Sequence, residues 1–362
     1  MRAAAFAING RAIGAGRPTY VVAELSANHG QRFAQAVELV RAAKAAGADA
    51  VKVQTYTADT LTIDAETPPF RIHAGTPWSG RTLYDLYREA YTPWDWQPKL
   101  QALALELGLD FFSSPFDRTA VDFLEGLQVP AYKVASFELV DLPLIAYIAA
   151  TRRPMILSTG MATLEEIEQA LQAARSAGAT QLALLKCTSA YPAAPEEMHL
   201  RTIPHLAETF QVPVGLSDHT LGHTVPLAAV ALGACIVEKH LTLSRQVAGP
   251  DSQFSLEPDE FKAMVAAIRI AERALGQVRY AAGELEQRSR VFRRSLFAVE
   301  TIKAGDLLTE RNVRSIRPGT GLPPKHLAEV LGRRATQDIP RGTPLDWSLL
   351  EARSPVAEEM RR

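Results

Sequence analysis

Polar side chains end eight short apolar segments of this sequence, and several of them are of types that bind anions or transfer protons. Lys52 and Lys133 each stand between apolar neighbours, which is unusual for lysines at a solvated rim. Ammonium groups, hydroxyls and the N-termini of following helices together bind phosphate or carboxylate. The pattern therefore predicts a site for a small phosphorylated substrate, with the two lysines on neighbouring strands.

Each of the eight segments contributes at least one candidate to such a site. The polar ends are Glu24, Asn28 and His29; Lys52 and Gln54; Ser113 and Ser114; Lys133 and Ser136; Ser158 and Thr159; Lys186, Thr188, Ser189 and Tyr191; Ser217, Asp218 and His219; and Glu238, Lys239 and His240. For one hydroxyl alone, such as Ser158 or Ser217, a helix cap is the better interpretation. The repetition over eight segments favours a shared site.

His219 and His240 close two of these segments and could share one divalent cation. Imidazole is a common ligand of divalent transition metals, and two ligands leave coordination positions for water and substrate. Neither histidine belongs to a short metal-binding motif, and a single histidine at a strand end is more often structural. Asp218 and Glu238 beside them favour the metal interpretation.

The elements that position these residues follow from the alternation of short β-branched runs with longer segments of helical periodicity. The predicted strands are Tyr20–Leu25, Ala50–Gln54, Asp110–Ser113, Ala131–Ala135, Met155–Ser158, Leu182–Cys187, Val212–Leu216 and Cys235–Lys239, and predicted helices include Ala34–Ala46, Leu164–Ala177 and Thr224–Leu232. Eight βα units over about 265 residues match a (β/α)8 barrel, in which catalytic groups lie at the C-terminal strand ends. A doubly wound sheet is the alternative, but no GxGxxG follows the first strand.

After Gly276, the alternation of strand-like and helical segments gives way to a charged stretch and then to short strand-like segments with Gly and Pro. We predict a catalytic barrel over residues 1–280, a charged linker over 281–294 and a small, mostly β module over 295–352, followed by a tail over 353–362. Within the module, the predicted strands are Leu296–Val299, Val313–Arg317 and Ala335–Ile339.

Composition narrows the classes of function. The net charge of −1 gives no basic surface for nucleic acid, and no apolar run is long enough to cross a membrane. No segment resembles a signal peptide, so we expect a cytoplasmic protein. Cys187 and Cys235 lie in apolar runs without the spacing of zinc or disulfide sites, which predicts buried packing residues.

Nine short motifs closely resemble the sialic acid synthase family. They are A-E-L-S-A-N-H-G (23–30), V-K-V-Q-T-Y (51–56), F-S-S-P-F-D (112–117), A-Y-K-V-A-S-F-E (131–138), I-L-S-T-G-M (156–161), L-L-K-C-T-S-A-Y-P (184–192), G-L-S-D-H-T (215–220), E-K-H (238–240) and G-P-D (249–251). The tail resembles the family's antifreeze-like SAF domain, a β-clip fold, through R-S-L (294–296) and R-P-G-T-G-L (317–322). The resemblance spans about Ile8 to Leu350.

The resemblance implies an enzyme that condenses phosphoenolpyruvate with the aldehyde of an open-chain amino sugar, releasing phosphate. It assigns phosphoenolpyruvate to Lys52, Ser114, Lys133, Ser136, Ser158, Ser189 and Ser217. It assigns a divalent ion, Mn²⁺ or Mg²⁺ with Co²⁺ as a further candidate, to His219 and His240. The sugar would contact Glu24, Gln54, Trp78, Tyr191, Asp251 and Arg317, and Glu24, the two lysines and the two histidines would be catalytic.

Four departures from the sialic-acid pattern resemble the pseudaminic-acid-making branch of the family. They are Leu25-Ser26, Phe137, Ser189 and the segment P-W-S-G-R-T-L-Y-D-L-Y (77–87). The losses of amide side chains and the gains of Trp78 and Phe137 imply a less polar pocket, suited to 2,4-diacetamido-2,4,6-trideoxy-altrose. The alternatives are a legionaminic or N-acetylneuraminic acid synthase, a Trp78 that only packs its loop, and a non-catalytic sugar-binding protein.

The resemblance also implies a two-fold homodimer in which the C-terminal domain of one subunit covers the barrel of the other. Arg317 matches the arginine that reaches across to the substrate. Without the family, Arg317 is an exposed loop charge.

Overall fold

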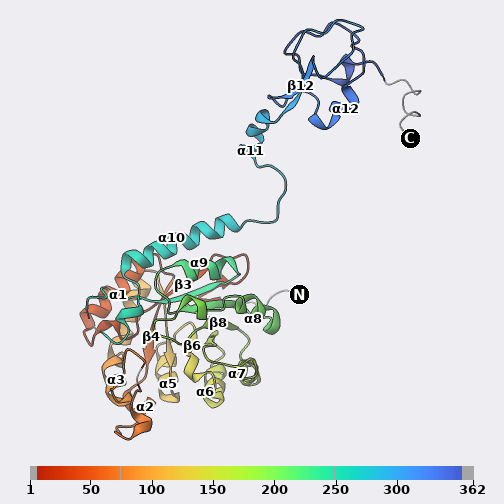
Figure 1. The fold of residues 1–362 in the computed structure, drawn as a ribbon. Coiled ribbons are helices and arrows are strands. Elements are labelled where there is room, and N and C mark those ends of the chain that lie inside the picture. The colour runs from red at the N-terminus through yellow and green to blue at the C-terminus, as the bar shows by residue number, and fades with distance from the viewer. Residues whose placement is uncertain (1–5, 74, 248, 353–362) are drawn as a thin grey trace. The chain divides into compact units, whose positions relative to one another are not determined.

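Eight parallel strands form a closed barrel in the computed structural model, which describes residues 6–73, 75–247 and 249–352. The strands are β3 (Tyr20–Glu24), β4 (Ala50–Thr55), β5 (Asp110–Pro115), β6 (Tyr132–Val134), β7 (Met155–Ser158), β8 (Leu182–Cys187), β9 (Val214–Asp218) and β10 (Ile236–His240). Neighbours along the chain pair in order, and β10 closes the barrel on β3. The predicted (β/α)8 barrel is confirmed (Figure 1).

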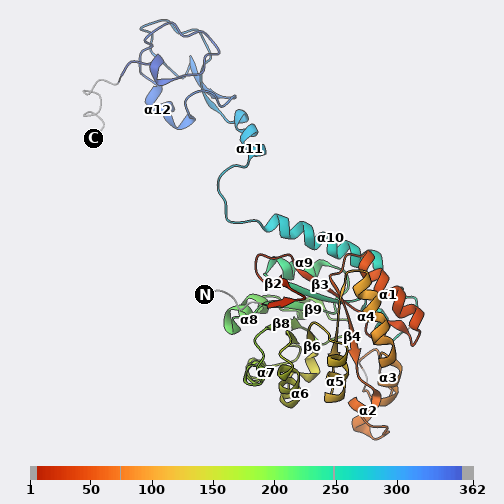
Figure 2. The ribbon, with the colours of Figure 1, turned by 180° about the vertical axis from the view of Figure 1, so that it is seen from behind.

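The helices surround the strands, as the reverse view also shows (Figure 2). They are α1 (Phe33–Ala45), α2 (Ala58–Leu61), α3 (Leu83–Ala90), α4 (Gln97–Glu106), α5 (Arg118–Gly126), α6 (Leu142–Ala150), α7 (Leu164–Ser176), α8 (Thr202–Phe210), α9 (Thr224–Ala231) and α10 (Pro258–Leu275). Side-chain caps begin several of them: Asp117 accepts two backbone N–H bonds at α5, and Thr163 forms a capping box with Glu166 at α7. None of the helices in the described ranges is long and apolar enough to span a bilayer.

Burial on both faces explains the apolar composition of the strands. β3, for example, is buried at every position because side chains on one face fill the barrel and those on the other contact helices. Large buried residues such as Tyr20, Phe111 and Tyr132 occupy this core. Because the interior is packed with side chains, space for a ligand remains only where the strands end.

A short hairpin that sequence periodicity did not predict precedes the barrel. Strands β1 (Phe6–Ile8) and β2 (Arg11–Ile13) pair antiparallel. Arg11 forms an ion pair of 2.5 Å with Asp49, directly before β4, and the Ala7 amide donates to Gln181, directly before β8. The hairpin therefore covers the N-terminal end of the barrel, opposite the polar strand ends.

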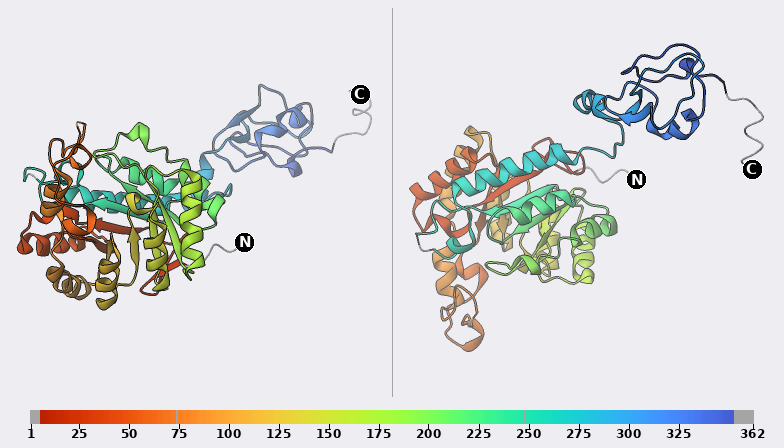
Figure 3. Two further views of the ribbon diagram at one scale, coloured as in Figure 1. Left: turned by 90° about the horizontal axis from the view of Figure 1, so that it is seen from below. Right: turned by 45° about the horizontal axis from the view of Figure 1, so that its top comes forward.

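The C-terminal unit begins at Gln277 and is described by itself. It contains α11 (Glu284–Arg288), β11 (Ser295–Ala298), β12 (Val313–Ile316) and α12 (Leu327–Val330), with β11 and β12 antiparallel. Most of this unit is drawn in blue in Figure 3. The predicted strand Ala335–Ile339 is wrong, since its ends form only isolated bridges, to Leu350 and Ile302. The segment interpreted as a linker carries the short helix α11. The predicted tail, 353–362, lies outside the described residues.

Candidate active site

A cavity of about 390 Å³ opens at the C-terminal ends of the barrel strands. Twelve of the fifteen residues to which the resemblance assigns a catalytic, substrate or metal role line it: Glu24, Lys52, Gln54, Trp78, Lys133, Ser136, Ser158, Tyr191, Ser217, His219, His240 and Asp251. Three do not. Ser114 lies behind Lys52, Ser189 lies beside Gly160, and Arg317 belongs to the C-terminal unit.

Two buried lysines and two buried carboxylates form the charged centre of the cavity. Lys52 Nζ lies 2.6 Å from Glu24 Oε2 and 3.4 Å from Glu238 Oε1, and Lys133 Nζ lies 3.9 Å from Glu238 Oε2. The expectation of neighbouring strands is wrong, because β5 separates β4 from β6. Alternate strands of such a barrel supply the side chains of one interior layer, which is why the lysines still share Glu238.

Burial shifts the proton affinities of this group. It raises the pKa of Glu24 above its usual range, and the Lys52 ammonium lowers it in part. It also lowers the pKa of Lys133, an effect to which the Lys52 charge adds. Burial raises the pKa of Glu238, but the charges of Lys133 and Lys52 lower it by more. The pKa of Glu238 therefore lies below its usual value. The site therefore combines a carboxyl that readily takes a proton with ammonium groups held out of water.

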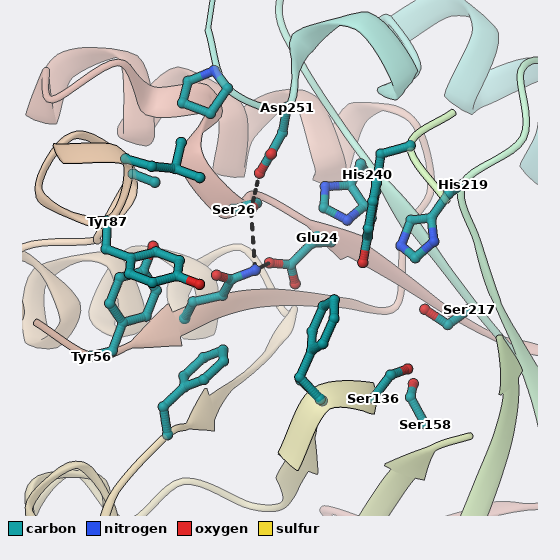
Figure 4. Close-up of a pocket in the computed structure, with 18 of the residues that line it drawn as sticks. Glu24, Ser26, Tyr56, Tyr87, Ser136, Ser158, Ser217, His219, His240 and Asp251 are labelled. Atoms are coloured by element: carbon teal, nitrogen blue, oxygen red, sulfur yellow. Dashed lines mark hydrogen bonds between the residues drawn. The ribbon is translucent and has the colours of Figure 1, made fainter. Parts of the chain in front are cut away.

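The hydroxyl groups of Ser136, Ser158 and Ser217 gather on one side of the cavity (Figure 4). The Gly160 amide donates to Ser136 Oγ at 3.1 Å, which leaves the Ser136 hydroxyl hydrogen free to donate elsewhere. Ser158 Oγ is buried and has no hydrogen-bond partner. Since buried polar atoms in folded proteins almost always have partners, this hydroxyl fits a ligand that supplies one.

We call the hydroxyl groups of Ser136, Ser158 and Ser189 the serine cradle. The absence of a side chain at Gly160 leaves room for them. A Cβ at this position would lie 2.2 Å from Ser189 Oγ and 2.7 Å from Ser136 Oγ. Gly160→Ala should therefore displace both hydroxyls and raise the KM for the phosphorylated substrate expected from the sequence by about 10- to 100-fold, the loss expected for one or two hydrogen bonds to a charged group. Steady-state kinetics with any second substrate held at saturation measure it.

Gly126→Ala, in α5, is the matched control, since an added Cβ there meets nothing within 4 Å. We expect its kinetics to equal those of the parent protein. A KM in Gly160→Ala within twofold of the parent value would contradict the assigned cradle.

The two histidines lie together, with ring centroids 5.3 Å apart. His219 Nδ1 is 2.9 Å from the Thr188 carbonyl oxygen, which directs the other ring nitrogen elsewhere. His240 Nδ1 is buried without a hydrogen-bond partner, and burial together with nearby positive charge holds the pKa of His240 well below its ordinary value. A neutral, unpartnered imidazole fits a divalent cation, although no third His, Cys or carboxylate completes a ligand cluster within the described ranges.

A chain of polar contacts joins Asp251 to Glu24 on the other side of the cavity (Figure 4). Ser26 donates to Asp251, and Gln54 Nε2 donates to Ser26 Oγ at 3.1 Å and to Glu24 Oε1 at 3.2 Å. Trp78 Nε1 donates to the Pro250 carbonyl at 2.8 Å. Trp78 thus fastens its loop, as the alternative interpretation held, and it also lines the cavity.

An apolar wall faces the polar groups. It comes from the long segment between β4 and β5 and from the ends of β5 and β6, through Tyr56, Leu83, Leu86, Tyr87, Phe116 and Phe137. Phe137 is 58% exposed, so its ring is available for contact with a ligand. Of these residues, only Phe137 and the segment 77–87 were singled out from the sequence.

Several lining residues received no catalytic, substrate or metal role from the resemblance, although Glu238 was among the polar strand ends and Ser26 among the departures from the sialic-acid pattern. Ser26, Glu138 and Glu238 line the cavity, as does Cys187, which is buried as predicted but faces the cavity as well. Burial raises the pKa of Glu138 to about 7. The position of Glu238 at a strand end was a usable signal. Ser26 and Glu138 lie in 3-10 turns that come after their strands. An apolar pattern does not predict such positions.

Comparisons with known proteins identify the family of the chain. The NeuB family model matches residues 39–280, and the SAF domain model matches residues 293–351. The pseudaminic acid synthase of Campylobacter jejuni (strain 81-176) is 45% identical over 332 residues, covering 92% of this chain and 96% of that protein. The N,N'-diacetyllegionaminic acid synthase of Legionella pneumophila is 36% identical over 345 residues, covering 94% and 96%.

Among solved structures, the spore coat polysaccharide biosynthesis protein spsE of Bacillus subtilis is similar to this chain with a TM-score of 0.66 and 33% identity. The match covers 97% of this chain and all of that one. Two family models and relatives matched over most of their length therefore agree with the barrel and the C-terminal unit. The chain belongs to the NeuB family and carries a C-terminal SAF domain.

Proposed function

We propose that this chain is a pseudaminic acid synthase. It would join C3 of phosphoenolpyruvate to the aldehyde carbon of 2,4-diacetamido-2,4,6-trideoxy-altrose, add one water at C2 and release phosphate, giving a nine-carbon 2-keto acid. The single observation that carries the proposal is the cavity in which buried lysines, free hydroxyls and a histidine pair meet an apolar wall. The 45% identity to a pseudaminic acid synthase supports the choice of sugar.

Phosphoenolpyruvate would bind where Lys52 and Lys133 face the serine cradle. Within the described part of the chain, the carboxylate nearest to Lys133 is 3.9 Å away, so its charge is available to a phosphate or carboxylate group. Ser158, Ser136 and Ser217 line the same cavity and would present their hydroxyls to the same group. Ser114 accepts from Lys52 Nζ at 3.1 Å and would orient that ammonium from behind.

His219 and His240 would hold the divalent cation, Mn²⁺ or Mg²⁺. When bound, the cation supplies a Lewis acid that polarises the sugar aldehyde. The His219–Thr188 contact sets the orientation of one ring, and the low proton affinity of His240 keeps the other ring neutral. Both are conditions for imidazole to act as a ligand.

Glu24 would position a reactant or accept its proton. Its carboxylate lies between Lys52 and Gln54, and burial raises its pKa above the usual range. A carboxyl with a raised pKa exchanges a proton near neutral pH more readily than an exposed one. Gln54 would hold Glu24 in a fixed position relative to Asp251, which would contact the sugar, because Gln54 is hydrogen-bonded to Glu24 and Ser26 and Ser26 is hydrogen-bonded to Asp251.

The sugar would lie between the Asp251 chain and the apolar wall. Tyr191 and Trp78 contact each other, with ring centroids 5.4 Å apart, and line the same end of the cavity. An apolar wall accommodates the methyl groups of a 6-deoxy sugar with two acetamido groups, whereas a hydroxyl placed there would lack a partner.

A panel of sugars tests the proposal. With phosphoenolpyruvate and Mn²⁺, kcat/KM for the diacetamido-trideoxy-altrose should exceed that for N-acetylmannosamine by about 100-fold or more, the discrimination expected when a hydroxyl is left unpaired. Phosphate release measures turnover, and the stereoisomer that gives legionaminic acid serves as the intermediate comparison. Phosphate release with N-acetylmannosamine alone would contradict the choice of sugar.

The proposed assembly is a homodimer in which the SAF domain of one subunit covers the barrel of the other and presents Arg317 to the substrate. Charge supports it: residues 277–362 contain 16 Lys and Arg against 11 Asp and Glu, whereas residues 1–276 contain 23 against 29. Opposite net charges favour the association of the two surfaces.

The proposed location is the cytoplasm. Cys187 and Cys235 are both free and buried, which fits a compartment where thiols stay reduced.

A further inference from the structure

A fully buried ion pair lies directly behind the two histidines. Lys239 Nζ, on β10, lies 2.5 Å from Asp218 Oδ2, on β9, and both side chains are 0% exposed. Neither residue lines the cavity. Successive side chains of a strand point to opposite faces, so Glu238 and His240 face the cavity while Lys239 faces away from it.

The ammonium of Lys239 reaches both residues that flank His219. Besides Asp218, it donates to the backbone carbonyl of Thr220. Asp218 in turn accepts from the Thr220 amide at 3.1 Å and from the Thr220 hydroxyl at 3.0 Å. One cation, carried by the residue before His240, therefore holds the chain on either side of His219.

The sheet itself does not provide this connection. The pairing of β9 with β10 ends at Asp218 and Lys239, and β9 ends at Asp218. His219 is thus the first residue beyond the ladder, and its backbone has no strand partner on β10. The contacts of Lys239 with Asp218 and Thr220 join β10 to the chain around His219, beyond the last hydrogen-bonded pair of the two strands.

Stability alone is a weak reason for such a pair. Removing two charges from water costs several kcal/mol per ion, and apolar residues of similar volume often serve as well or better. Groups behind metal ligands, by contrast, commonly set ligand geometry, and their loss typically lowers metal affinity 10- to 100-fold.

We infer that the Lys239–Asp218 pair is a positioning device that fixes His219 relative to His240 and thereby sets the affinity of the site for a divalent cation. The inference rests on the proposed role of the two histidines as metal ligands. Lys239 and Asp218 would contact neither metal nor substrate.

The test compares Lys239→Met with Arg269→Met in the full-length protein. Arg269 forms a partly exposed ion pair with Asp49 at 3.0 Å at the opposite end of the barrel, so its loss removes an ion pair without reaching the histidines. The Kd for Mn²⁺ is measured by electron paramagnetic resonance without substrate, alongside Tm. We expect the Kd to rise about 10- to 100-fold in Lys239→Met and to stay within twofold in Arg269→Met.

Asp218→Asn keeps the shape of the side chain and serves if Lys239→Met does not fold; it should raise the Kd by a smaller factor. A Kd within twofold of the parent value in a folded Lys239→Met or Asp218→Asn, with only Tm lowered, would overturn the inference. His240→Ala distinguishes a failure of the metal assignment from a failure of the positioning role. Unchanged Mn²⁺ binding in that variant contradicts the metal site itself, whereas lost binding there with unchanged binding in Lys239→Met contradicts the positioning role alone.

Discussion

Replacing His240 with alanine should abolish Mn²⁺ binding and lower kcat by about 1,000-fold or more. The cation is proposed to contribute several kcal/mol of charge stabilisation when the aldehyde reacts, and a tenfold change in rate corresponds to about 1.4 kcal/mol. His240 Nδ1 is buried without a partner, so its loss leaves no internal hydrogen bond of that atom broken. We therefore expect a folded protein, measured by Mn²⁺ titration and by phosphate release.

His223→Ala is the control, because His223 is an exposed histidine that begins α9 without a side-chain capping bond. Its Mn²⁺ affinity and turnover should equal those of the parent protein. Unchanged turnover in His240→Ala would refute the assignment of the metal to this pair.

Lys133→Met should raise the KM for phosphoenolpyruvate by about 100-fold while leaving the fold intact. Lys52 pairs with Glu24 at 2.6 Å and Glu238 at 3.4 Å, but among the described residues Lys133 pairs only with Glu238, at 3.9 Å. Burial lowers the pKa of Lys133, which means that the folded protein holds this charge at a cost in stability. Methionine removes the cost and the charge together, and charged hydrogen bonds are worth about 1.5–3 kcal/mol each.

We accordingly expect a Tm in Lys133→Met equal to or above that of the parent, together with the loss of phosphoenolpyruvate affinity. Lys262→Met, on the exposed face of α10, should change neither quantity. The assignment fails if Lys133→Met binds phosphoenolpyruvate as the parent does.

Much of the barrel could be predicted from the sequence because its strands are buried on both faces and therefore read as apolar runs. The exact first and last residues of the strands were harder to predict. The predicted Val212–Leu216 and Cys235–Lys239 lie two and one residues before the observed β9 and β10, because Asp218 and His240 belong to the ladder despite being polar. The hairpin of β1 and β2 was missed since three residues are too few to establish a period of two.

From the strand pattern alone, the site was predictable only where reactive side chains lie at strand ends, whereas Trp78 and Asp251 were found through the family resemblance. Lys52, His219 and His240 fulfil that condition, and parallel strands bring such ends to one mouth. The apolar wall could not be found in the same way, because Tyr56 and Leu86 reach the cavity through the fold of the segment between β4 and β5. In the SAF domain, the ends of Ala335–Ile339 meet different partners, which an alternating pattern alone does not reveal.

Carbon labelling tests the central claim most directly. Phosphoenolpyruvate carrying ¹³C at C3 is mixed with the diacetamido-trideoxy-altrose carrying ¹³C at its aldehyde carbon, and the products are observed by nuclear magnetic resonance. The proposed reaction predicts one new ¹³C–¹³C coupling for each phosphate released. Release of phosphate with the label in free pyruvate, and no coupling between the two carbons, would contradict it.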